Sequence, residues 1–70
     1  MRDNSEALAA FIARKTEIDT VLARLAALSA DHFNAMPDAV TWGHVGSLGG
    51  YLECLRRVSD AAFGEGEHAV

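Results

Sequence analysis

The sequence predicts an all-α protein, an antiparallel two-helix hairpin that dimerises into a four-helix bundle. Two long segments carry apolar residues at helical spacing, and no segment shows the alternation of apolar and polar residues that is typical of a strand. The only proline lies between these segments. A chain of 70 residues forms one domain near the lower limit of independent stability. We therefore expect a second copy of the hairpin to complete the burial of its apolar residues.

The first predicted helix covers residues 3–28. Asp3 is the expected N-cap, and Glu6 follows three residues later, as in a capping box. No glycine or proline interrupts the chain before Pro37. At about 100° per residue, the large apolar residues of this segment fall on one broad face. They are Leu8, Phe11, Ile12, Ile18, Val21, Leu22, Leu25 and Leu28.

The opposite face of this helix carries only small residues, at alternating spacings of four and three. They are Ala9, Ala13, Thr16, Thr20, Ala23, Ala27 and Ala30. Alanine is the strongest helix former, so such a face is compatible with exposure to solvent. Small residues also allow a second helix to approach closely. The sequence leaves both interpretations open, and a bulky charged residue at Ala13 or Ala23 would distinguish them.

Residues 29–40 are expected to connect the two helices. One further helical turn can extend to Ala35, and the sequence leaves open whether this connection holds a short helix. Pro37 predicts a turn, and Met36 before it should be extended. The apolar side chains of the connection are expected to close the end of the core.

The second predicted helix covers residues 41–63, with Thr41 as its N-cap. Its large apolar residues again follow a spacing of three and four. They are Val45, Leu48, Leu52 and Leu55. Gly64 is expected to end this helix because glycine adopts the left-handed conformation that helix ends require. The helical domain would then cover residues 1–64, and residues 65–70 would form a flexible tail.

Four of the six glycines lie in residues 42–50, at the start of the second helix. Each glycine inside a helix costs about 1 kcal/mol relative to alanine, so the cluster needs an explanation. The spacing of Gly43, Gly46 and Gly49 matches neither the P-loop nor the dinucleotide-binding fingerprint, and no strand precedes it. Close approach of another helix is the preferred explanation, and a loop-like first turn is the alternative. Trp42 is expected to cap the core with its indole ring.

These patterns predict two sets of packing positions. The residues expected to pack the hairpin or the dimer are Phe11, Ile18, Leu22, Leu25, Leu48, Leu52 and Leu55. The residues expected where helices approach closely are Gly43, Gly46, Gly49, Ala13 and Ala23. Both sets point to helix–helix contacts as the main property of the chain.

The sequence predicts neither a catalytic site nor a metal site. Metal-ligand atoms are carried by His32, His44, His68 and Cys54, but no two of these residues are three or four positions apart. His44 is expected to be the third residue of the second helix. His44 and Ser47 lie one helical turn apart, but they lack an orienting acid and an oxyanion-stabilising group. We therefore expect a non-enzymatic protein without a cofactor.

Charge and apolar content limit the partners that the sequence predicts. The net charge of −4 argues against non-specific binding to nucleic acids and to anionic membranes. The apolar run at residues 7–13 is too short to span a bilayer, and no signal peptide is visible. The single cysteine cannot form an intramolecular disulfide and suits a reducing compartment. A cytoplasmic location is therefore expected.

Three stretches of the sequence share a pattern with known helical hairpins. They are Phe11-Ile12 followed by Thr16, residues 25–31 and residues 52–65. In these stretches the chain resembles the repressor-of-primer (Rop) family, plasmid-encoded hairpins that dimerise into a four-helix bundle and bind paired RNA loops. The resemblance implies RNA contact through an exposed Phe11, with Arg14 nearby and Lys15 where the family has a polar Gln.

A second resemblance lies in residues 32–46, which include the stretch Trp42-Gly43-His44-Val45-Gly46, and in residues 63–69. These segments look like small uncharacterised bacterial proteins of mobile elements, a resemblance that implies no activity. The sequence as a whole predicts a homodimeric interaction or regulatory module that can also bind another protein. RNA binding through the first helix ranks second, and an enzyme or metal protein ranks last.

Overall fold

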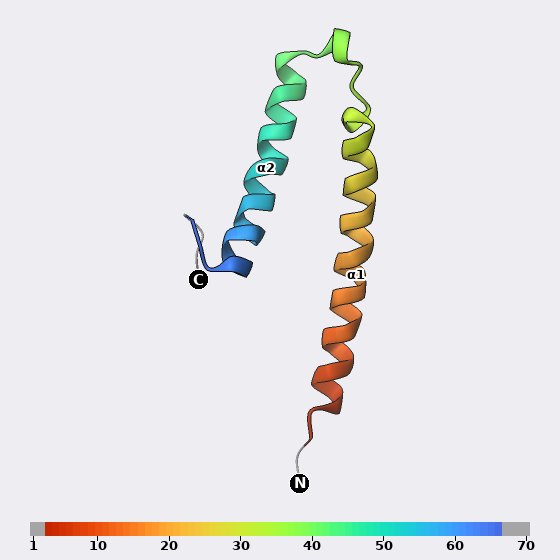
Figure 1. Ribbon diagram of the computed structural model, residues 1–70, viewed down its shortest axis with the longest axis vertical. Helices are drawn as coiled ribbons and strands as arrows, with labels where there is room; N and C mark the ends of the chain where they lie inside the picture. Colours follow the sequence, from red (N-terminus) through yellow and green to blue (C-terminus); the bar gives the residue numbers. More distant parts are fainter. Residues whose placement is uncertain (1–2, 67–70) are drawn as a thin grey trace. The chain divides into compact units, whose positions relative to one another are not determined.

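The computed structural model describes residues 3–66 as two α-helices joined by two short 3₁₀ turns (Figure 1). The elements are α1 (Ser5–Ala30), η1 (His32–Asn34), η2 (Pro37–Ala39) and α2 (Trp42–Phe63). No strand occurs within residues 3–66, so the prediction of an all-α protein is confirmed. The chain divides into two units after Asn34: the first holds α1 and η1, and the second holds η2 and α2.

The start of α1 differs from the expected one. The helix begins at Ser5, its N-cap is Asn4, and no side chain caps it, so the predicted capping box of Asp3 and Glu6 is wrong. Instead, Oδ1 of Asp3 accepts hydrogen bonds from the backbone N–H of Ser5 at 3.2 Å and from its hydroxyl at 2.9 Å. The backbone hydrogen bond, followed by the hydroxyl one, holds the pKa of Asp3 below its ordinary value. The carboxylate thus accepts a hydrogen bond from one of the N–H groups that have no partner within the first turn of the helix.

At its other end, α1 continues to Ala30, two residues beyond the expected end. The C-cap is Asp31, whose backbone N–H donates to the carbonyls of Ala27 at 3.3 Å and Leu28 at 3.1 Å. The last turn of α1 contains no basic residue. Because the free carbonyls of a helix C-terminus form the negative end of its dipole, the carboxylate of Asp31 lies where a negative charge is unfavourable.

The turn η1 is left-handed. A right-handed turn to Ala35 was expected, but φ is 57° at His32, 53° at Phe33 and 62° at Asn34. The left-handed helical conformation costs an L-residue roughly 1–2 kcal/mol, and among these three asparagine and histidine adopt it more often than phenylalanine does. This turn therefore holds backbone strain, and it ends α1 abruptly. A short helix does occur in the connection, as η1 and η2 show, but both are 3₁₀ turns.

We expect His32→Gly to stabilise the protein by roughly 0.5–1 kcal/mol. Glycine removes the steric cost of the left-handed conformation, about 1–2 kcal/mol, and adds a smaller cost of about 0.5–1 kcal/mol in backbone entropy. The urea midpoint should rise accordingly. His32→Ala removes the same imidazole but keeps the Cβ atom, so it should give no increase. Equal midpoints for the two variants would show that the turn is not strained.

The start of α2 agrees with the prediction. Thr41 is the N-cap with extended backbone, and its hydroxyl accepts from the backbone N–H of His44 at 3.4 Å. In return, Nδ1 of His44 accepts from the backbone N–H of Thr41 at 3.0 Å, which completes a capping box. The third helical residue is therefore His44, as expected. Met36 is also extended as predicted, with ψ of 127° before Pro37.

Removal of this capping box should loosen the glycine-rich first turns of α2. We expect Thr41→Ala to cost about 1 kcal/mol of folding free energy, because it leaves an N–H of the first turn without its acceptor. Thr41→Ser retains a hydroxyl in the same place and should cost much less. Urea unfolding followed by circular dichroism measures both changes. An equal loss in the two variants would mean that the hydroxyl is not what stabilises this end.

The end of α2 also agrees with the prediction. Gly64 adopts the left-handed conformation with φ of 63°, and the backbone N–H of Glu65 donates to the carbonyl of Asp60 at 3.0 Å. This six-to-one hydrogen bond belongs to a Schellman motif. Gly66 follows with φ of 71°, and a Cβ there would lie 2.7 Å from the carboxylate of Asp60. Residues 67–70 of the expected tail lie outside the described residues.

Neither unit has a hydrophobic core of its own. No side chain within residues 3–66 is buried. A few are half-buried, namely Leu25, Leu28, Phe33, Ala35 and Asp60. A folded domain of ordinary kind buries most of its leucine and isoleucine side chains. What each unit presents is therefore a helix whose apolar residues remain available for contact.

Candidate docking surfaces on the two helices

The apolar face of α1 is defined here by Phe11, Ile18, Leu22 and Leu25. These residues are separated by seven, four and three positions, so they lie along one side of the helix. Phe11 is 66% exposed, Ile18 and Leu22 are both more than half exposed, and Leu25 is half-buried. The residues predicted to pack thus share one face, and their own unit leaves that face open.

The apolar face of α2 is defined by Leu48, Leu52 and Leu55, at spacings of four and three. These side chains are 41%, 47% and 45% exposed. Complete burial of a leucine or phenylalanine side chain stabilises a protein by about 1.5–3 kcal/mol. The exposed half of each side chain on the two faces therefore offers about 1 kcal/mol to whatever covers it. Over seven side chains this is comparable to the stability of a small domain.

The expected close-approach positions have open space around them in this chain. A Cβ added at Gly46 or Gly49 would meet nothing within 4 Å, and at Gly43 it would meet only Oγ1 of Thr41 at 3.4 Å. Ala13 and Ala23 are exposed. No contact within the second unit accounts for the glycines of α2. A close approach by a helix at these five positions stays a prediction.

Trp42 corrects the expectation of an indole that caps the core. It is the first residue of α2 and is 87% exposed, more than any other large apolar side chain described. Cys54 is also exposed. Met36 and Val40 of the connection are exposed as well, whereas Phe33 and Ala35 of that segment are half-buried. These side chains extend the apolar surface of the protein beyond the two helical faces.

The residues expected to contact RNA lie together on α1. Phe11, Arg14 and Lys15 are related by spacings of three and four, so they share one side of the helix, and all three are exposed. The ammonium of Lys15, however, forms an ion pair with Oδ2 of Asp19 at 2.7 Å. This pair reduces the positive charge that the side of α1 offers to a phosphate backbone.

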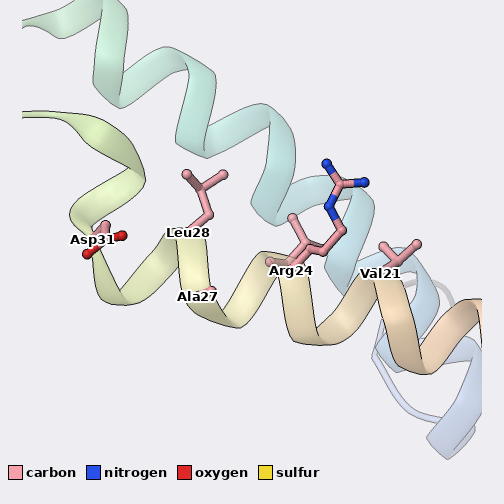
Figure 2. A pocket seen from close by; sticks show the side chains of 6 residues that line it. Val21, Arg24, Ala27, Leu28 and Asp31 are labelled. Carbon is pink, nitrogen blue, oxygen red and sulfur yellow. The ribbon is translucent and has the colours of Figure 1, made fainter.

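A shallow hollow on the C-terminal part of α1 was not predicted from the sequence. It is lined by Val21, Arg24, Leu25, Ala27, Leu28 and Asp31. Figure 2 shows Val21, Arg24 and Leu28 pointing to the same side of α1. The available signal was the spacing of seven between Arg24 and Asp31, which places opposite charges on one side of a helix, two turns apart.

Residues 3–66 contain no cluster of side chains that could bind a metal ion. Three or more side chains of the kinds that bind metals do not meet anywhere in this range. His68, a further candidate ligand, lies outside the described residues. Neither α1 nor α2 is long and apolar enough to cross a membrane.

Comparison of the chain with protein-family models, with curated proteins and with solved structures gives no match. The similarities to the Rop family and to mobile-element proteins therefore stay predictions. The exposed faces of α1 and α2 are the features of the chain that bear on its function.

Proposed function

We propose that the protein is a non-enzymatic interaction module that acts as a homodimer. In this proposal α1 and α2 form an antiparallel hairpin domain over residues 1–64, and two hairpins form a four-helix bundle. The observation that supports it is the exposure of the apolar faces of both helices, since no side chain within residues 3–66 is buried. Most of the stability of a helix in a protein comes from the packing of its apolar face, so these faces need cover for the helices to persist.

A second copy of the chain is the simplest cover. In a hairpin, two helices touch along one line and leave part of each apolar face open, whereas four helices enclose a shared core. A different protein with an apolar helical face could take the same place. A homodimer accounts for the exposed faces without a further gene product, and it is the form in which we state the proposal.

Sedimentation equilibrium tests this proposal. The expected mass is twice the 7.5 kDa of one chain, and the melting temperature should rise with protein concentration because association stabilises the folded state. A monomeric mass at high micromolar concentration, together with a cooperative melt that does not depend on concentration, would contradict it.

The small-residue face of α1 gives a further prediction. If this face packs against another helix, Ala23→Glu should lower the melting temperature by several degrees and weaken the dimer, because a long charged side chain cannot fit where backbones approach. Ala13→Glu should act in the same direction. Mass and melting temperature measure the effect. If both variants match the wild type, the alanines serve only as helix formers on a solvent-exposed face.

RNA binding by α1 is the second candidate function. The exposure of Phe11 beside Arg14 favours it, and the Lys15–Asp19 ion pair weakens it. Binding to a structured RNA should be visible as a mobility shift at low salt, should fall steeply as salt is added, and should be lost in Lys15→Glu. The absence of a shift at low salt would remove this candidate and leave the homodimer proposal unchanged.

A further inference from the structure

The hollow on α1 has charged groups of opposite sign along one edge. Val21, Leu25 and Leu28 supply its apolar lining, and Arg24 and Asp31 are its charged residues. Arg24 and Asp31 lie two helical turns apart, about 10 Å along the axis. Neither makes an ion pair within the part of the chain that the structure describes.

Each of these charges is in a position that favours an opposite charge from outside α1. Asp31 is the C-cap, next to the negative end of the helix dipole, and the last turn has no basic residue to offset it. The guanidinium of Arg24 borders an apolar surface. A partner that covers this surface removes water from the guanidinium, so the partner must supply a carboxylate to compensate for the lost hydration. A cover that brings one cation and one anion, 10 Å apart in the reverse order, would satisfy both.

We propose that this hollow is covered by the same hollow of a second copy, with the two α1 helices antiparallel around a two-fold axis. This inference rests on the proposed homodimer and specifies one of its interfaces. In a two-fold interface every contact occurs twice, once from each copy. A contact between Arg24 of one copy and Asp31 of the other therefore forms two ion pairs. The seven positions that separate Arg24 from Asp31 are the same in both copies, so in the antiparallel arrangement both ion pairs can form at once.

The pairing of the charges also fixes which residues lie nearest the axis. If Arg24 faces Asp31 of the second copy, the axis passes between residues 27 and 28. Ala27 and Leu28 flank the line of contact there, and the short side chain of Ala27 allows the two helices to approach closely.

Charge reversal tests this arrangement. In Arg24→Asp each copy has two acids at the interface, and in Asp31→Arg each copy has two bases, so each variant alone should have a dimer dissociation constant at least tenfold above that of the wild type. An equimolar mixture should regain the wild-type constant, because every acid of one variant then faces a base of the other. The mixed dimer also has the same total charge as the wild-type dimer. Sedimentation velocity over a concentration series measures all three, with one variant dye-labelled to identify the mixed dimer.

Two controls separate pairing from other effects. Arg57→Asp makes the same change in net charge as Arg24→Asp, but it lies on α2, outside the hollow and on a side of that helix away from Leu52, and it should leave the dissociation constant near that of the wild type. Asp31→Arg places a cation at the C-terminus of α1, which is favourable for the helix dipole, so at a protein concentration that keeps this variant dimeric its helix content should be at least that of the wild type. Loss of association in this variant would therefore not come from unfolding.

The outcomes distinguish this inference from the proposed function. If the wild type is a dimer but the reversals do not weaken it, or the mixture does not restore it, the α1–α1 pairing is wrong and the homodimer stands. If the wild type is monomeric at every concentration, both proposals fail. Weakening by each reversal with recovery in the mixture supports the pairing.

Discussion

Leu52→Asp is expected to dissociate the protein and to remove much of the helical signal of both helices. Leu52 lies in the middle of the α2 apolar face and is 47% exposed within its own chain. A carboxylate in a covered face loses the transfer free energy of the leucine and adds the cost of a charge without water, at least 3 kcal/mol together. Sedimentation and circular dichroism at 222 nm should show a monomer of low helix content.

Ser47→Asp is the matched control for this change. This substitution places the same carboxylate on α2 five residues before Leu52, on a side of the helix away from Leu52. It should leave mass and helix content close to those of the wild type. If Leu52→Asp also stays dimeric and helical, the apolar face of α2 is not a contact surface, and the homodimer proposal loses its main support.

Substitutions at Gly46 are expected to act in opposite directions on helix formation and on association. The structure leaves open space around this position, so Gly46→Ala should make α2 more helical, by about 1 kcal/mol. Gly46→Leu should instead weaken the dimer by about 1–3 kcal/mol, since a bulky side chain meets the helix that is expected to approach there. Helix content in dilute solution and mass in concentrated solution measure the two effects separately.

Ala61→Leu provides the comparison for the Gly46 series, because it adds the same side chain to an exposed position of α2 about four turns beyond Gly46. Its association should match that of the wild type. If Gly46→Leu also folds and associates normally, close helix packing does not explain the glycines. A binding site at the start of α2, next to the exposed Trp42, would then be the better explanation.

The sequence predicted best those features that neighbouring residues determine. Thr41 and Gly64 mark the ends of α2 through hydrogen bonds to residues within five positions, and both predictions are confirmed. The beginning of α1 failed because Asp3 and Asn4 both suit an N-cap, and a composition pattern does not choose between adjacent candidates. The left-handed turn also could not be predicted, since positive φ is uncommon for any residue but glycine and Phe33 in its middle does not favour it.

The candidate surfaces were predictable in part. Helical periodicity alone identified the residues of both apolar faces, because side chains three and four positions apart lie on the same side of a helix. The exposure of Trp42 was missed because a large aromatic residue is usually buried, and only the structure shows that no neighbour covers it. Arg24 and Asp31 were missed because charged residues on a helix usually face solvent. In the proposed homodimer these surfaces are covered by a second molecule, and a single sequence does not encode that choice locally.

The lack of buried side chains has a consequence for how long the protein survives once it is made. Proteases cleave chains that open, and each unit has no interior of its own to resist opening. In the proposed homodimer, protection comes from assembly, and the fraction of assembled chains rises with the amount of free chain. Turnover would be fast while copies are scarce and slow once they are abundant, so the steady level of the protein would respond more than proportionally to its rate of synthesis.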